Sequence, residues 1–493
     1  MRKGTARDPV RILLIRAQLP GMATVPPLGL LCLSAAVKKL VPQPVEVALL
    51  HPGVAGCDRA AIAGALTRHR PDIVGISAYS VEAKLMHSLA RQARARAPGA
   101  VVAVGGPHPT IYWDEALRDP NIDLAVLGEG ERSFAAVAAA VAQGRDVDGI
   151  PGLALRRGGR VVTTGPARLV DDLDTLPDPD WDLIDPEDYR GRRTMNMVVA
   201  DPRVMPMFTS RGCPYACAYC HGLFGRGIRM HCAETVVRRM EHLQRRYGIR
   251  EFHIYDDFFN ADRGRLLDIC RLIGERGIRA HLAFPNGLRA DRMDEEMVLA
   301  LQRAGTYSVV YAVETASERL QRLIGKRLDL GRARAIIDFT ASRGIFTQCF
   351  FMLGFPTETE AEMRRTIEYA KDSGLHWAHF FAVVPFRRTA LHRLAVEHAG
   401  RDAVDPCQQD GYSPLRPFSH LVPPARLNWL RLKAMMTVNF APRRALARQA
   451  VLRRACPGRE AALHNLRANT VRYVVNGAVI RWIKHSRIPS EAG

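Results

Sequence analysis

The chain has 493 residues, of which 47% are hydrophobic and 24% are charged. This length exceeds what one ordinary core fills, and this composition excludes a disordered or collagen-like chain. No run of eighteen apolar residues occurs, so we expect no membrane-spanning helix. The formal net charge is +20, and ten cysteines are too few for a disulfide scaffold of this size. We therefore expect a cytoplasmic protein of two or three domains.

Residues 1–143 alternate between short apolar runs and helical patterns. The apolar runs are continuous in Val, Ile and Ala, which is typical of strands buried on both faces of a parallel sheet. We predict a Rossmann-like, doubly wound α/β domain. The predicted strands are residues 11–15, 45–50, 73–77, 101–104 and 124–127, and the predicted helices are 28–40, 59–68 and 82–97.

Residues 144–196 differ in composition from what precedes them. They contain a hairpin-like stretch at 153–163 and then a segment dense in Pro and Asp, which indicates a linker. A new strand–helix rhythm follows over residues 197–390 and predicts a partial (βα)6 barrel of the TIM type. Its strands are predicted at residues 206–210, 252–255, 281–284, 308–313, 347–353 and 377–384. Residues 391–493 are basic and helical in pattern.

Three cysteines follow the first predicted barrel strand directly, at Cys213, Cys217 and Cys220. The spacing C-x3-C-x2-C places three thiolates on one loop, where they can bind three irons of a 4Fe–4S cluster and leave the fourth iron open. Two alternatives remain: a zinc site completed by His221 or Cys232, and unrelated cysteines. Structural zinc sites usually use two separated pairs of ligands, so the cluster is favoured.

The stretch RGCPYACAYC around these cysteines resembles the cluster loop of the radical S-adenosylmethionine (SAM) superfamily. The resemblance implies that SAM binds the open iron and is cleaved reductively to a 5′-deoxyadenosyl radical. It also implies that Tyr219, just before the third cysteine, lies against the adenine.

Polar residues also follow the other predicted barrel strands, where βα-barrel active sites form. Glu314 ends the fourth strand in VVYAVETASERLQRLIGK, which resembles the family motif whose Glu holds the SAM amino group. Arg289 follows the third strand and is expected to bind cofactor. Asp256 and Asp257 end the second strand, and either a functional or a structural role is open for them.

In the N-terminal domain, Ser77 and the pair Gly105-Gly106 end two successive strands. Glycines at such a position let the backbone approach a ligand closely. Together with VPPLGLLCLS, VGGPHPT and LGEGERSF they resemble the cobalamin-binding domain that precedes many radical SAM cores. The motif D-x-H-x-x-G is missing, which implies cobalamin without a histidine ligand to cobalt. The alternative is a domain that kept its fold and lost its ligand.

The final segment carries fourteen Lys or Arg residues from Arg426 to Arg487. Residues 469–485 have the pattern of a basic amphipathic helix. Docking on the barrel is favoured, and contact with an anionic membrane surface is an alternative. Nucleic-acid binding is disfavoured because aromatic residues are not interleaved with the basic ones.

These features predict a cobalamin-dependent radical SAM enzyme, similar to the class B methyltransferases. We expect it to methylate an unactivated carbon of a small-molecule or lipid-like metabolite, with electrons from a donor such as flavodoxin or ferredoxin. A radical cyclase or ring-rearranging enzyme resembling the anaerobic porphyrin cyclases is one alternative. A cobalamin-binding regulator with a relic cluster and an RNA-modifying enzyme are the others.

Overall fold

The computed structural model describes residues 9–55, 59–400, 418 and 420–455. It divides into two compact units, one of residues 1–193 with 229–231 and the other of residues 194–228 with 232–493. The basic helix expected at residues 469–485 lies outside the described residues. No helix within the described ranges is both long and apolar enough to cross a membrane.

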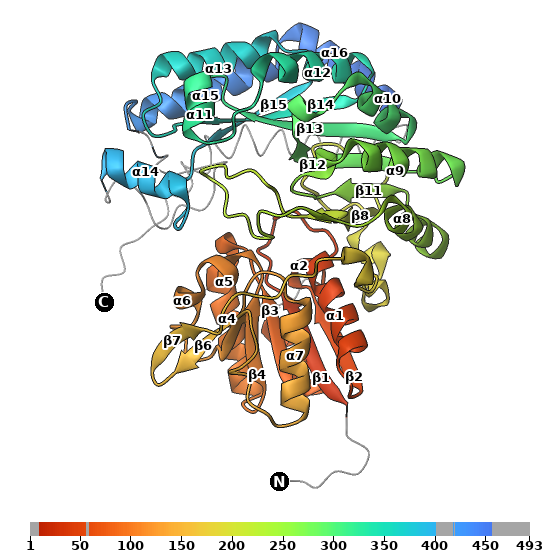
Figure 1. Cartoon of the computed structure of the whole chain (residues 1–493), viewed down its shortest axis with the longest axis vertical. Helices are drawn as coiled ribbons and strands as arrows, with labels where there is room; N and C mark the ends of the chain where they lie inside the picture. The colour runs from red at the N-terminus through yellow and green to blue at the C-terminus, as the bar shows by residue number, and fades with distance from the viewer. Residues whose placement is uncertain (1–8, 56–58, 401–417, 419, 456–493) are drawn as a thin grey trace. The chain divides into compact units, whose positions relative to one another are not determined.

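The first unit is built on one seven-stranded sheet with the order β2-β1-β3-β4-β5-β6-β7 (Figure 1). Its strands are β1 Val10–Arg16, β2 Val45–Leu50, β3 Ile73–Ser77, β4 Val101–Gly105, β5 Leu124–Val126, β6 Leu153–Arg157 and β7 Arg160–Thr163. The first five pair in parallel, as the buried apolar runs predict. The hairpin at 153–163 adds β6 and β7 antiparallel to β5, so the sheet is mixed at that edge.

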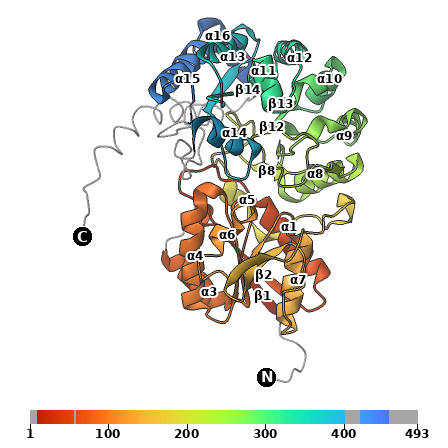
Figure 2. The same cartoon turned by 60° about the vertical axis from the view of Figure 1, so that its left-hand side comes forward.

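Two helical layers cover this sheet. On one face α1 (Leu28–Leu40) and α7 (Glu131–Ala142) pack together, and on the other face lie α3 (Arg59–His69) and α4 (Ala83–Arg96) (Figure 2). The chain reverses its winding between β1 and β3, and open α/β sheets bind ligands outside the carboxyl ends of the strands at such a point. The fold therefore places one candidate site at the ends of β1, β3 and β4.

The second unit holds a six-stranded parallel sheet with the order β15-β14-β13-β12-β11-β8. It is the expected partial barrel, because six strands pair in series and the first and last do not pair with each other. The strands are β8 Val204–Met207, β11 Glu251–Ile254, β12 His281–Leu288, β13 Thr306–Glu314, β14 Phe346–Leu353 and β15 Trp377–Ala382. The helices that alternate with them are α8 Ala233–Tyr247, α9 Arg263–Glu275, α10 Glu295–Arg303, α11 Glu318–Leu323, α12 Leu330–Ser342 and α13 Glu360–Asp372.

Local chemistry fixes where these helices begin. Asp, Ser or Thr side chains accept a hydrogen bond from the backbone of the first turn of five successive helices, which satisfies N–H groups that the helix leaves unpaired. The capping residues are Asp262, Asp294, Ser317, Asp329 and Thr359. Four of these helices start between four and nine residues after a strand end, and α12 follows α11. The residues between strand end and helix start are therefore left for function.

Two further helices, α15 (Pro424–Asn439) and α16 (Pro442–Ala455), close the open side of the sheet at β15. The Asn439 amide accepts from Ala378 N at 2.7 Å and donates to Ala378 O at 2.9 Å. Arg431 donates to Phe380 O at 3.2 Å. These side chains satisfy the outer backbone groups of the edge strand, which would otherwise be free to pair with another chain.

Candidate active site

The loop with the three cysteines lies between β8 and α8 and depends on a glycine. Gly212 has φ +88°, and a Cβ there would come within 2.1 Å of Gly227 O. The loop is also tied to the rest of the unit, because Ala218 N donates to Ile324 O and Leu391 N donates to Ala218 O, both at 2.8 Å. A side chain at position 212 would therefore collide with the backbone of Gly227 and displace the loop.

The three thiols lie close enough on this loop to influence one another. Burial raises the pKa of Cys213, and Cys217, Asp257 and Cys220 raise it further. Burial likewise raises the pKa of Cys220. A cluster binds each thiolate through a different iron, and its positive irons would offset the cost of holding these thiolates together. The donor set therefore fits a cluster with three protein ligands.

The geometry disfavours the zinc alternative. The Cys232 thiol accepts from Thr235 N at 3.4 Å as the N-cap of α8, and His221 Nε2 donates to Arg387 O at 2.9 Å. Each candidate fourth ligand thus already has a structural partner, which binding to zinc would have to displace.

Glu314 lies at the end of β13 with its backbone at φ +71°, which is uncommon for a residue with a side chain. Its buried carboxylate accepts from Tyr219 OH at 3.2 Å and from Lys326 Nζ at 2.9 Å. Burial, followed by the Glu314 charge, raises the pKa of Tyr219 well above its usual value. The structure thus brings together the expected Tyr219 and Glu314 with a cation that the sequence analysis did not assign, Lys326.

Arg289 has a different environment from the one expected of a free cofactor ligand. Its guanidinium pairs with Asp291 at 2.8 Å, donates to Lys326 O at 2.9 Å and lies 3.8 Å from the ring centre of Tyr215 in the cysteine loop. Arg289 therefore braces the cysteine loop against the segment that carries Lys326.

The two aspartates that end β11 have separate surroundings. Asp256 is buried and accepts from Thr209 N at 2.6 Å and from Ser210 Oγ at 2.7 Å. It therefore holds the chain just before the cysteine loop, which is the structural role. Asp257 is exposed, and its charge acts on Cys213 and Cys220.

Aromatic side chains line the inner face of the sheet. Phe351 lies against Tyr369 of α13 on the outer face, so its neighbour Phe350 points inward. Phe350 contacts the rings of His379 and Phe381 at 5.3 and 5.4 Å between centroids. Burial lowers the pKa of His379 to about 3, so this wall is uncharged at neutral pH. Phe350 and Phe381 are partly exposed, so they can contact a substrate.

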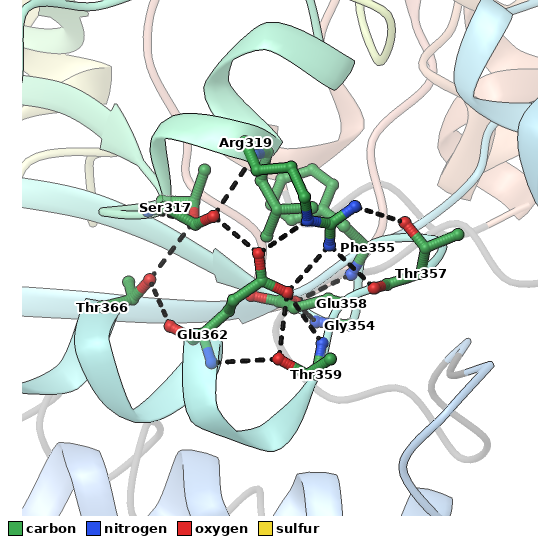
Figure 3. A network of polar contacts seen from close by, with 11 residues as sticks. Ser317, Arg319, Gly354, Phe355, Thr357, Glu358, Thr359, Glu362 and Thr366 are labelled. Carbon is green, nitrogen blue, oxygen red and sulfur yellow. Dashed lines mark hydrogen bonds and ion pairs between the residues drawn. The ribbon is translucent and has the colours of Figure 1, made fainter.

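A polar network rigidifies the turn that leaves β14 (Figure 3). Glu362 binds Arg319 at 2.8 Å and accepts from Ser317 Oγ at 2.7 Å. Burial alone would raise the pKa of Glu362, but Arg319 lowers it to about 2. The neighbouring Glu358 accepts from Gly354 N at 2.6 Å, and burial raises its pKa to about 8.

In the first unit, Ser77 and Gly105 are register partners at the carboxyl ends of β3 and β4. Gly106 has φ +88°, and a Cβ there would lie 2.9 Å from Ser77 Oγ. β4 ends at the first of two glycines, which have no side chain, beside the small side chain of Ser77 at the end of β3, so a ligand can approach the backbone closely. The geometry fits the cobalamin tail that the sequence predicts at these three residues.

The buried His51 has no free ring nitrogen. Its Nδ1 lies 2.9 Å from Tyr189 OH, and its Nε2 contacts Gln18 Oε1. Burial lowers the pKa of His51 to about 3. His108 is also buried, and its Nδ1 lies 3.3 Å from Ser80 Oγ. Both histidines have structural partners.

Two family models match the chain. Residues 22–138 match the B12 binding domain, and residues 207–370 match the radical SAM superfamily. The two matches fall on the two sheets described above.

Curated relatives cover much of the chain. An uncharacterised methyltransferase of Pyrococcus horikoshii is 30% identical over 76% of this chain and 79% of its own length. The cytidylyl-2-hydroxyethylphosphonate methyltransferase of Streptomyces wedmorensis is 31% identical over 66% of this chain and 67% of its own. An anaerobic magnesium-protoporphyrin IX monomethyl ester cyclase of Synechocystis is 24% identical over 93% of both.

Solved structures share the fold. A radical SAM methyltransferase of Kitasatospora setae, solved with cobalamin and a 4Fe–4S cluster, superposes with a TM-score of 0.67 at 20% identity. The match covers 85% of this chain and 81% of that one.

Proposed function

Because the chain belongs to the cobalamin-dependent radical SAM family, we propose that it is a methyltransferase that couples reductive SAM cleavage to methyl transfer from cobalamin. The observation that carries this proposal is the grouping of the Cys213, Cys217 and Cys220 thiols on the loop that also brings Tyr219 to Glu314.

The site residues of the second unit have the following proposed roles. Cys213, Cys217 and Cys220 bind three irons, and the bound cluster supplies the electron that cleaves the sulfonium C–S bond of SAM. Glu314 accepts a hydrogen bond from the amino group of SAM, and Lys326 binds the carboxylate of SAM. The ion pair between Lys326 Nζ and Glu314, 2.9 Å long, supports this because SAM carries the same two charges in a small zwitterion. Tyr219 packs on the adenine, and Arg289 positions the loop through Tyr215.

In the first unit, Ser77, Gly105 and Gly106 are proposed to receive the cobalamin tail. Cobalamin bound there supplies a transferable methyl group. His51 is not proposed as a cobalt ligand, because Tyr189 and Gln18 already engage both of its ring nitrogens.

The substrate is proposed to be a small-molecule or lipid-like compound whose reacting part is apolar. The uncharged wall of Phe350, His379 and Phe381 supports this, because burying a charge against it would be costly. An electron donor such as flavodoxin or ferredoxin would reduce the cluster.

A cyclase is the second candidate, favoured by the 24% identity to the Synechocystis cyclase over 93% of both chains. Mass spectrometry of the product distinguishes the two. A methyltransferase product is heavier by one CH2 group, whereas a cyclised product is oxidised and gains no carbon.

The test is anaerobic reconstitution with iron, sulfide and hydroxocobalamin, followed by assay of 5′-deoxyadenosine. Cys213→Ala, Cys217→Ala and Cys220→Ala should each abolish SAM cleavage and leave cobalamin binding intact. Cys232→Ser is the matched control, because serine can keep the α8 cap and position 232 is a candidate ligand only in a zinc site. Cleavage that survives any of the three alanine variants would contradict the ligand assignment.

A further inference from the structure

Helix α15 is apolar on two opposite faces. Its buried face, with Leu427, Leu430 and Val438, packs on the barrel. The exposed face carries Trp429, Leu432 and Met436, each 44% exposed, at helical spacings of three and four residues. Soluble surface helices normally have a polar outer face, so this second stripe indicates a partner.

Further exposed apolar side chains lie just before and just after α15. Six of the ten exposed large hydrophobic side chains among the described residues lie between residues 421 and 446. They are Leu421, Trp429, Leu432, Met436, Phe440 and Leu446. More than half of the exposed large hydrophobic side chains of the described residues thus lie on α15 and the segments next to it.

All charged side chains of residues 420–455 are positive. Residues 420–455 contain no Asp or Glu and eight Lys or Arg, which are Arg426, Arg431, Lys433, Arg443, Arg444, Arg448, Arg453 and Arg454. Arg426 and Lys433 lie 4.3 and 4.8 Å from the ring centre of Trp429. An exposed tryptophan is thus flanked by Lys433 and by Arg426, whose guanidinium also pairs with Glu360 at 2.8 Å. A tryptophan beside the exposed ammonium of Lys433 suits a boundary between an anionic layer and an apolar one.

We propose that the exposed face of α15, with the start of α16, binds an anionic lipid surface. Lipid headgroups would meet the exposed cations Lys433, Arg443, Arg453 and Arg454. The acyl boundary would receive Trp429, Leu432 and Met436. The basic segment 456–493 does not match this face in charge, since it carries six Lys or Arg and only two Glu. An aliphatic stripe is also poorly suited to nucleic-acid bases, which stack on aromatic rings.

The attachment of α15 relates this surface to the active site. A Cβ at Gly354, in the turn after β14, would lie 2.9 Å from Leu427 Cδ2 of α15. The N-terminal end of α15 is therefore packed at the carboxyl end of the barrel strands, where the cysteine loop also lies. Binding of α15 to a membrane would bring this end of the barrel close to lipid-soluble substrates.

The test is co-sedimentation of the full-length holoenzyme with phosphatidylcholine vesicles, with and without phosphatidylglycerol. We expect binding only to the anionic vesicles, weakening as salt is raised. The triple variant Trp429→Ser/Leu432→Gln/Met436→Gln and the double variant Lys433→Glu/Arg443→Glu should each bind at least about tenfold more weakly. Leu40→Gln and Arg91→Glu, at exposed sites of the first unit, are the matched controls.

Unchanged SAM cleavage in all four variants would show that they are folded. Brominated lipids should quench tryptophan fluorescence in the wild type, and most of that quenching should be lost in Trp429→Phe. Three results would overturn the proposal. They are no binding to anionic vesicles at low salt, full binding by the triple variant, or a solution dimer that the triple variant dissociates, which would assign the face to a second copy.

Discussion

Replacing Lys326 with methionine tests the proposed SAM site at the residue that sequence analysis did not assign. Methionine keeps most of the side-chain volume and removes the ammonium group. Lys326 is buried, and its Nζ lies 2.9 Å from Glu314 and 3.3 Å from Tyr219 OH. Of the two donors to the buried Glu314 carboxylate described above, the variant therefore keeps only Tyr219 OH.

The structure sets the size of the effect. A hydrogen bond to a charged group contributes about 1.5–3 kcal/mol, so loss of the Lys326 contact with the SAM carboxylate should weaken SAM binding roughly 10- to 150-fold. Breaking a buried ion pair also costs about 3–5 kcal/mol of stability when one partner is removed. Glu314→Gln should weaken SAM binding by a similar factor, and the double variant should be more stable than Lys326→Met because no carboxylate is left unpaired.

The assay is calorimetric titration of SAM into anaerobically reconstituted protein, with iron and sulfide content measured for each variant. Lys371→Met is the control, because Lys371 forms only a surface pair with Glu368. A dissociation constant for Lys326→Met within about twofold of the wild type, in protein with a full cluster, would refute the assignment of Lys326 to SAM.

Three further predictions concern the loop, the cobalamin edge and the turn after β14. Gly212→Ala should lower the iron content to that of Cys213→Ala, because its Cβ would lie 2.1 Å from Gly227 O, whereas Gly99→Ala, with open space around it, should not. Gly106→Val should lose cobalamin but keep the cluster and normal circular dichroism; retained cobalamin would contradict the proposed cradle. Burial raises the pKa of Glu358 from its ordinary 4.5 to about 8, so its stabilising contribution is full below about pH 4.5 and is lost as the pH rises through about 8. Because glutamine does not titrate, the unfolding free energy of Glu358→Gln relative to wild type should rise between about pH 5 and about pH 9, by at most on the order of 5 kcal/mol. The melting temperature of the variant relative to wild type should rise with it, and parallel pH profiles of the two proteins would contradict this.

Much of the fold was predictable because burial on both faces leaves a local mark in the sequence. The helix expected at residues 28–40 is α1, and the strand expected at 347–353 is β14 with one more residue. The sequence pattern predicted the hairpin at 153–163, but it did not predict that this hairpin pairs with β5. Pairing depends on contacts between distant residues, which no local pattern records.

The candidate site was predictable where function imposes close spacing. Three cysteines within eight residues predict a cluster loop without any tertiary information. Lys326 gave no such signal, because one lysine twelve residues after Glu314 is an ordinary surface pattern until α11 and the following turn bring it back to the carboxylate. The sequence also could not show that Arg289 is engaged by Asp291 and Tyr215.

The two backbone hydrogen bonds of Ala218 have a consequence for how the enzyme matures. They join the middle of the cysteine loop to Ile324 and Leu391 through backbone groups alone. Contacts of this kind lower the conformational entropy that binding of iron and sulfide would have to remove from the loop. Part of the cost of ordering the ligands is thus met by the polypeptide itself.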